Sequence, residues 1–272
     1  MKTWCIPPTA NAAFVYHMED VLRVYQLPYD HRTPVVCMDE ASKQLIGEVT
    51  APLPLRVGRA TCEDYAYERK GVCNQFMCCE PLRGWRHVRV TARRTRQDWA
   101  ECIRELADVY YPQATRIRLV LDNLNTHTGA SLYETFPPKE ARRLLDRLEF
   151  HYTPKHASWL NMAEIDIGVL QSQCLDRRLD NADWLRSEIG AWEERRNQRQ
   201  VKIHWGFTIA VARHKLHKLY PVIDNRKPPP VKRNLSIEDC QTTRGGSPWG
   251  VLTFGEDKRT RQSYTDPAQT PL

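Results

Sequence analysis

The chain has 272 residues, of which 41% are hydrophobic and 27% charged, and its 40 Lys and Arg against 33 Asp and Glu give a formal net charge of +7. These proportions are typical of a globular protein and exclude a collagen-like repeat, a coiled coil or a wholly disordered chain. The apolar runs span only a few residues, against the roughly 20 that a membrane-spanning helix needs, so we expect a cytoplasmic protein with no membrane partner.

Nine cysteines are scattered along the chain, with one cluster at Cys73, Cys78 and Cys79. A structural zinc site normally has paired, closely spaced ligands, and this cluster does not have that spacing. No apolar export signal precedes it, and free cysteines of intracellular proteins are usually buried. We therefore expect buried, reduced thiols, with a zinc site as the alternative.

The N-terminal part of the chain predicts one helix followed by strands. Apolar side chains recur at helical spacing between residues 10 and 25, which predicts an amphipathic helix. Strands are expected at residues 34–39, 44–50, 71–79 and 85–91. The first two would form a hairpin with a tight turn at 41–43, and the polar residues 58–70 predict a loop.

Helices and strands alternate further along the chain. Helices are expected at residues 97–111, 139–148, 159–175 and 181–200, and strands at 117–122 and 149–152. Ser158 is the expected N-cap of the third helix. This order predicts an α/β fold with a mixed β-sheet flanked by helices. We expect an N-terminal linker and helix in residues 1–33, one domain in 34–221, and a disordered tail in 222–272.

Two of the strand-like runs end in an acid, at Asp39 and Asp122. If these strands are neighbours in one sheet, both carboxylates lie at strand ends, where functional sites collect. A third acid on a packed helix would complete a set of oxygen ligands for Mg²⁺ or Mn²⁺. Glu164 and Asp166 flank the apolar stripe of the predicted helix at opposite edges, so spacing does not choose between them. The alternative is that each aspartate only stabilises a turn.

Three blocks around these acids carry a family resemblance. They are Val36-Cys-Met-Asp39-Glu-Ala, Leu119-Val-Leu-Asp122-Asn-Leu-Asn-Thr-His127 and the stretch from His151 to Glu164. They resemble the signature blocks of DDE transposases, and more narrowly the mariner-like transposases of bacterial insertion sequences, the insertion-sequence 630 family. Gly84-Trp-Arg-His-Val is a further similar stretch, and the resemblance extends from residue 3 to residue 221.

The resemblance implies a ribonuclease-H-like catalytic domain in residues 34–221. In it Asp39, Asp122 and Glu164 would bind two Mg²⁺ or Mn²⁺ ions, and the resemblance alone selects Glu164 over Asp166. It implies cleavage of DNA at the element ends and strand transfer into target DNA, by a homodimer associated with the nucleoid.

Four polar residues near the acids are candidates for orienting phosphates or water beside the metal, or for contacting DNA. They are Asn123, His127, Lys155 and His156. The simpler interpretation is that the Asn and His side chains bond to the backbone of their own turns.

The sequence also departs from the family pattern. Full-length relatives carry an N-terminal helix-turn-helix region that recognises the element ends, and only a linker-like piece around Trp4 resembles it here. Between Asp122 and Glu164 lie 41 residues, more than the family pattern has, with an insertion expected at 134–143. Two hypotheses remain open: an active nuclease and strand-transfer domain that relies on a DNA-binding partner, or a truncated, inactive remnant with at most non-specific DNA binding.

Overall fold

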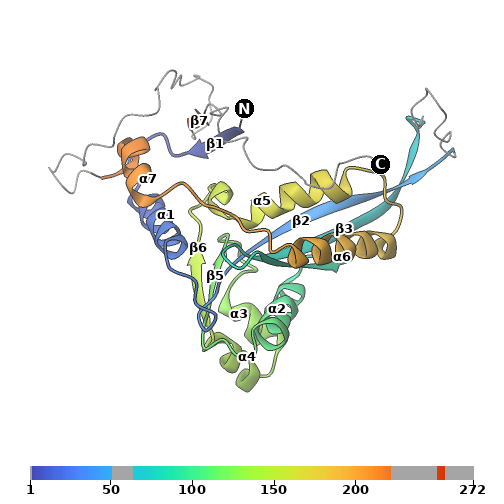
Figure 1. Cartoon of the computed structure of the whole chain (residues 1–272), viewed down its shortest axis with the longest axis horizontal. Coiled ribbons are helices and arrows are strands. Elements are labelled where there is room, and N and C mark those ends of the chain that lie inside the picture. The colour runs from blue at the N-terminus through green and yellow to red at the C-terminus, as the bar shows by residue number, and fades with distance from the viewer. Residues whose placement is uncertain (1, 51–63, 222–249, 255–272) are drawn as a thin grey trace.

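A five-stranded mixed sheet forms the centre of the computed structural model, which describes residues 2–50, 64–221 and 250–254 (Figure 1). Its strands are β2 (Val35–Glu48), β3 (Tyr67–Glu80), β4 (Trp85–Thr91), β5 (Ile117–Leu121) and β6 (Leu148–Tyr152), in the order β4-β3-β2-β5-β6. Strands β2, β5 and β6 are parallel, whereas β3 and β4 are antiparallel to their neighbours. The predicted α/β class, a mixed sheet flanked by helices, is confirmed.

Helices cover both faces of this sheet. One face carries α2 (Arg96–Glu105), α3 (Gly129–Thr135) and α4 (Pro138–Leu145), which Figure 1 shows below the sheet. The other face carries α5 (Ala163–Leu170), α6 (Ala182–Gln198) and part of α1 (Ala12–Tyr25). Side chains alternate between the two faces of a strand, so Met38 packs in the first core and Cys37 in the second.

The chain ends lie outside the main sheet. Helix α7 (Ile209–Lys215) and the short 3-10 helix η4 (His217–Leu219) pack with α1 in a third cluster. Strand β1 (Lys2–Ile6) pairs with β7 (Gly250–Phe254) in a two-stranded antiparallel sheet. The rest of the predicted tail, residues 222–249 and 255–272, lies outside the described residues, so its predicted disorder stays a prediction.

The predicted hairpin turn at 41–43 is wrong. Strand β2 continues through this segment, and Ser42 pairs with Asn74 of β3. The segment has no Asn-Gly or similar pair that would favour a two-residue turn, and a long antiparallel partner extends the strand instead. Accordingly, the predicted loop at 58–70 becomes strand from Tyr67 onward, and its residues 58–63 lie outside the described part. Figure 1 shows β2 and β3 extending together as a long ribbon.

The helix predictions were right in place but not in detail. The helix expected at 97–111 is α2 followed by a π-helical turn, η1 (Leu106–Tyr110). The helix expected at 159–175 is divided into a 3-10 turn, η2 (Ser158–Leu160), then α5, then a π-helical turn, η3 (Gln171–Leu175). Ser158 is not an N-cap, because α5 begins only after Asn161, whose side-chain oxygen accepts a hydrogen bond from the Ala163 amide at 3.2 Å. Helix α3 was not predicted.

Buried cysteines are confirmed on the central strands. Cys73, Cys78 and Cys79 lie on β3, and all three are buried free thiols. Cys78 packs in one core and Cys79 in the other, because neighbouring strand residues face opposite sides of the sheet. None of the helices formed by the described residues is long and apolar enough to cross a membrane.

Candidate active site

The parallel register of β2 and β5 places Asp39 and Asp122 side by side. Cys37 pairs with Val120, and each aspartate follows its member of that pair by two residues. Side chains two residues apart in a strand point to the same face, which for Cys37 and Val120 is the face covered by α5. Asp39 therefore lies on the side of α5, just beyond the point where β2 and β5 stop pairing, and Asp122 directly follows the last residue of β5 beside it.

Asp39 is held by two hydrogen bonds and lies among other acids. Its Oδ1 accepts from the Glu40 amide at 2.8 Å, and its Oδ2 accepts from Asn161 Nδ2 at 3.4 Å. Burial first, and then the neighbouring carboxylates of Glu164, Asp122 and Glu40, raise the pKa of Asp39 to about 7. Glu164 and Asp122, the other two predicted acids, therefore both act electrostatically on Asp39.

Asp122 contacts a buried histidine. His127 Nδ1 lies 2.6 Å from Asp122 Oδ1, and His127 Nε2 lies 2.6 Å from Glu40 Oε1. The ring is fully buried and stacks on Trp99. Burial lowers the pKa of His127, but the two carboxylates outweigh it and raise the pKa to about 9. At neutral pH the imidazole is therefore a cation that links Asp122 to Glu40.

Glu164 and Asp166, which spacing did not separate, have different environments on α5. Glu164 is exposed, whereas Asp166 is completely buried and paired with Arg86 Nε at 3.2 Å and Arg196 Nη2 at 3.3 Å. The predicted placement at opposite edges of the stripe is thus wrong, because the ion pairs draw Asp166 into the buried side. Of these two acids, Asp166 is neutralised by arginines, whereas the charge of Glu164 acts on Asp39.

Comparison with protein families decides the classification. Residues 34–186 match the sequence model of the family described as DDE superfamily endonuclease, a stretch that contains Asp39, Asp122 and Glu164. The chain belongs to this DDE endonuclease family. With the family established, the mixed five-stranded sheet confirms the expected ribonuclease-H-like fold class. No curated protein matches the chain.

Solved structures of the Mos1 mariner transposase are similar to this DDE domain at low identity. The paired-end complex with Mn is 12% identical, with a TM-score of 0.47, over 72% of this chain and 60% of that chain. The Mos1 strand transfer complex is 11% identical, with a TM-score of 0.47, over 72% and 59%. The Mos1 catalytic domain is 10% identical, with a TM-score of 0.44, over 74% and 100%. The match thus spans 60% of the Mos1 chain in the first complex.

The other predicted site residues of the DDE domain divide into two groups. His127 contacts Asp122 directly, whereas Asn123, Lys155 and His156 are exposed. Lys155 and His156 follow β6, and the Thr153 amide still bonds to the Leu121 carbonyl at 2.9 Å. Because β5 and β6 are parallel, this loop leaves the sheet at the same edge as Asp122.

Two residues of the site were missed as functional candidates. Asn161 is fully buried, and its Nδ2 donates to the Met38 carbonyl at 2.7 Å as well as to Asp39. Glu40 is buried against His127. Both lie inside the three sequence blocks, but nothing in local spacing reveals their partners, which lie more than 80 residues away. The blocks themselves are the signal that could have pointed to them.

The donors of the DDE domain suit a hard divalent cation. Three carboxylates supply only oxygen, which Mg²⁺ and Mn²⁺ prefer, and a cation would favour the charged form of Asp39, whose pKa is raised by burial and then by the neighbouring carboxylates. Among the described residues, no three Asp, Glu, His or Cys side chains are already gathered as ligands around one point. Asp122 instead contacts His127, and Asp39 contacts Asn161. Each carboxylate can accept more than one partner, so these contacts can persist while the carboxylates move together around an ion.

Proposed function

We propose that this chain is the catalytic part of a DDE transposase of a bacterial insertion sequence, similar to the insertion-sequence 630 family. The observation that carries the proposal is the register of β2 and β5, which places Asp39 and Asp122 on adjacent parallel segments, together with the electrostatic effect of Glu164 on Asp39. The family match supports it, because the matched residues 34–186 include all three acids. The reaction would be metal-dependent DNA cleavage followed by strand transfer, the chemistry of DNA transposition and recombination.

Each acid has a distinct task in this proposal. Asp39 and Asp122 would supply oxygen ligands from the rigid sheet, and Glu164 would supply them from the exposed side of α5, where a DNA phosphate can approach. When bound, two Mg²⁺ or Mn²⁺ ions activate the attacking oxygen and stabilise the leaving oxygen of an in-line phosphoryl displacement. His127 orients Asp122, and Asn161 orients Asp39. No serine or tyrosine nucleophile is required.

The proposed partners are DNA and a second copy of the chain. The DNA comprises the element ends and the target, and the active form would be a homodimer associated with the bacterial nucleoid. The three acids are intact, which favours an active domain over the alternative, a truncated remnant with only non-specific DNA binding.

Nicking of supercoiled plasmid in the presence of Mn²⁺ or Mg²⁺ tests the proposal. The purified chain should nick the plasmid, and Asp122→Ala should reduce nicking to background. Asp183→Ala, which removes a 94% exposed carboxylate on α6, should leave nicking unchanged. A duplex carrying the element ends should be cut near its ends. Equal nicking by the parent chain and Asp122→Ala, or none by the parent chain, would contradict the proposal and favour the inactive remnant.

A further inference from the structure

We propose that Asp166, Arg86 and Arg196 form a buried ionic anchor that positions Glu164 for metal binding. The inference rests on the proposed function, in which Glu164 is a metal ligand. It adds three positioning residues to the three acids. Asp166 lies two residues after Glu164 on α5, so any rotation or shift of the helix at Asp166 moves Glu164 as well.

The anchor joins three elements through one carboxylate. Arg86 of β4 donates from Nε to Asp166 Oδ2 at 3.2 Å, and Arg196 of α6 donates from Nη2 to Oδ1 at 3.3 Å. All three side chains are buried, with exposures of 0% for Asp166, 1% for Arg86 and 8% for Arg196. Because each oxygen has a different arginine, the carboxylate is held at two points, which restricts the rotation of α5 about its own axis.

Arg86 is itself rigidly held. Its Nη1 donates to the Gly84 carbonyl at 3.2 Å and its Nη2 to the Val201 carbonyl at 2.6 Å. The side chain of Asn197 accepts from the Arg86 amide and donates to the Arg86 carbonyl, at 2.8 and 2.7 Å. The free edge of β4 is thereby covered by α6. The position of Arg86 is therefore set by the sheet and by α6 together.

The turn before β4 packs closely enough to require glycine. Gly84 has a φ of 73°, and a Cβ there would lie 2.4 Å from the backbone carbon and oxygen of Gln200. This contact explains why glycine begins the stretch Gly84-Trp-Arg-His-Val, a stretch that contains none of the three acids. The stretch places Arg86 within hydrogen-bond distance of Asp166 on α5.

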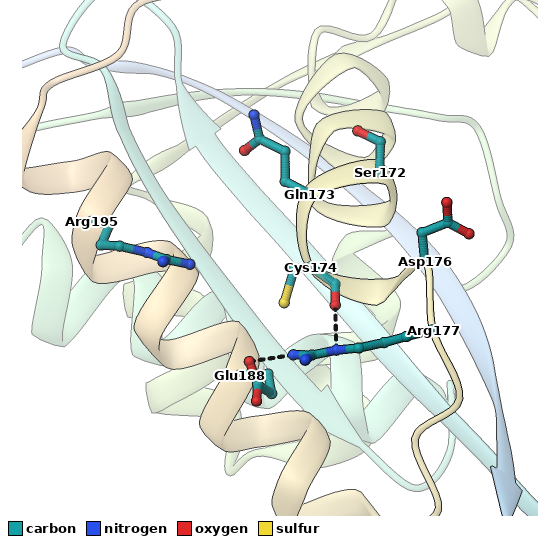
Figure 2. A pocket seen from close by; sticks show the side chains of 7 residues that line it. All are labelled: Ser172, Gln173, Cys174, Asp176, Arg177, Glu188 and Arg195. Atoms are coloured by element: carbon teal, nitrogen blue, oxygen red, sulfur yellow. Dashed lines mark hydrogen bonds and ion pairs between the residues drawn. The ribbon is translucent and has the colours of Figure 1, made fainter. Parts of the chain in front are cut away.

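Helix α5 depends on such contacts for its orientation. It has only eight residues, and its N-cap residue, Met162, supplies no side-chain hydrogen bond, so its stability comes largely from tertiary packing. The π-helical turn that follows it, η3, is held by Arg177, whose Nε donates to the Cys174 carbonyl at 3.2 Å and whose guanidinium pairs with Glu188 of α6. Figure 2 shows Arg177 reaching both groups. Asp166 is the corresponding fixed point beside Glu164.

Stability alone does not account for the anchor. Removing two guanidinium groups and a carboxylate from water is costly, and apolar replacements of similar volume are often equally stable. One carboxylate also leaves an excess of positive charge, and Arg196 Nε has no hydrogen-bond partner in the described chain. Apolar side chains would not provide two directed hydrogen bonds to Asp166, which restrict the rotation of α5.

Mn²⁺ affinity, measured by titration calorimetry and by the electron paramagnetic resonance of free Mn²⁺, tests the anchor. The apolar triple variant Arg86→Met, Asp166→Leu, Arg196→Met should stay folded by circular dichroism but bind Mn²⁺ roughly 10- to 100-fold more weakly, the range seen when groups supporting metal ligands are lost. Arg86→Lys, which keeps the charge but loses the planar fork, should weaken binding in the same direction. Glu164→Gln, which lacks the proposed carboxylate ligand, gives the Mn²⁺ affinity of a site without Glu164.

Glu80→Gln is the matched control, because it neutralises a buried carboxylate that contacts Tyr111 and Arg83 instead of α5. It should bind Mn²⁺ as the parent chain does. If Glu164→Gln weakens binding while the triple variant and Arg86→Lys do not, the anchor is refuted and the proposed function stands. If the triple variant unfolds, Arg86→Lys decides by the same criterion. If the parent chain binds no more tightly than Glu164→Gln, the proposed function fails, and the anchor with it.

Discussion

Asp39 and Glu40 are neighbours on β2, yet their carboxylates serve opposite faces of the sheet. Asp39 accepts a hydrogen bond from Asn161 at the start of α5, whereas Glu40 contacts His127, which stacks on Trp99 in the other core. The alternation of the strand separates them. Asp39 is therefore a candidate metal ligand, whereas its neighbour Glu40 holds His127, which in turn contacts Asp122.

Replacing His127 by leucine should strongly destabilise the protein. The buried imidazolium pairs with Glu40 and Asp122, and its loss leaves two acids without their cation. We expect a loss of about 3–5 kcal/mol in the free energy of unfolding, as when one partner of a buried ion pair is removed. Urea denaturation measures it. His31→Leu, at a side chain that is 71% exposed, should change stability little; equal losses in the two variants would contradict a buried ionic role for His127.

The metal-free protein should lose stability as the pH rises toward neutrality. Folding raises the pKa of Asp39 to about 7, so the folded state binds a proton that the unfolded state has released above its ordinary pKa. The stabilisation is complete at acid pH and disappears as the pH passes through about 7. Asp39→Asn should therefore gain stability relative to the parent chain between about pH 5 and about pH 8. Urea denaturation at each pH gives the free energy of unfolding. If this energy changes with pH in the same way in both proteins, Asp39 has no raised pKa.

Asn161→Ala should weaken both stability and nicking. The side chain donates to the Met38 carbonyl and to Asp39, and accepts from the Ala163 amide. Leaving these buried groups without partners should cost about 1–3 kcal/mol in the free energy of unfolding. Under conditions in which the variant is still folded, plasmid nicking in Mn²⁺ should also fall, because Asp39 loses its hydrogen bond from Asn161. Asn125→Ala, at an exposed position, is the control, and nicking equal to that control would count against a positioning role for Asn161.

Gly84→Ala should destabilise the protein by more than Gly71→Ala. Both glycines have positive φ, 73° and 105°, but a Cβ meets the Gln200 backbone at 2.4 Å in the first case and nothing within 4 Å in the second. Both variants strain the backbone, but only Gly84→Ala adds a steric clash, for which we expect about 1–3 kcal/mol, the usual cost of overpacking. Thermal unfolding of the two variants provides the comparison. Equal shifts in melting temperature would mean that the turn can move away from Gln200.

Several elements could be predicted locally because their signals are local. The apolar run of β5, the alternating valines of β4 and the helical spacing in α1 each predict one element correctly. The strand pairing could not be predicted in the same way. The antiparallel partner of β2 is β3, which lies beyond residues 49–66, so local spacing favours a shorter hairpin.

The sequence by itself determined the α/β class and the acid after β5, because periodicity and residue type need no knowledge of neighbours. The predicted strand end at Asp39 is wrong, because β2 continues to Glu48 along its antiparallel partner β3. Only the tertiary structure decided which acids meet. Asp166 and Glu164 are equivalent on a helical wheel, and Arg86, 80 residues away, draws one of them into the core. Likewise, His127 joins Glu40 to Asp122 only once β2 and β5 are adjacent. Charge pairing and burial depend on distances in space, which spacing along the chain does not contain.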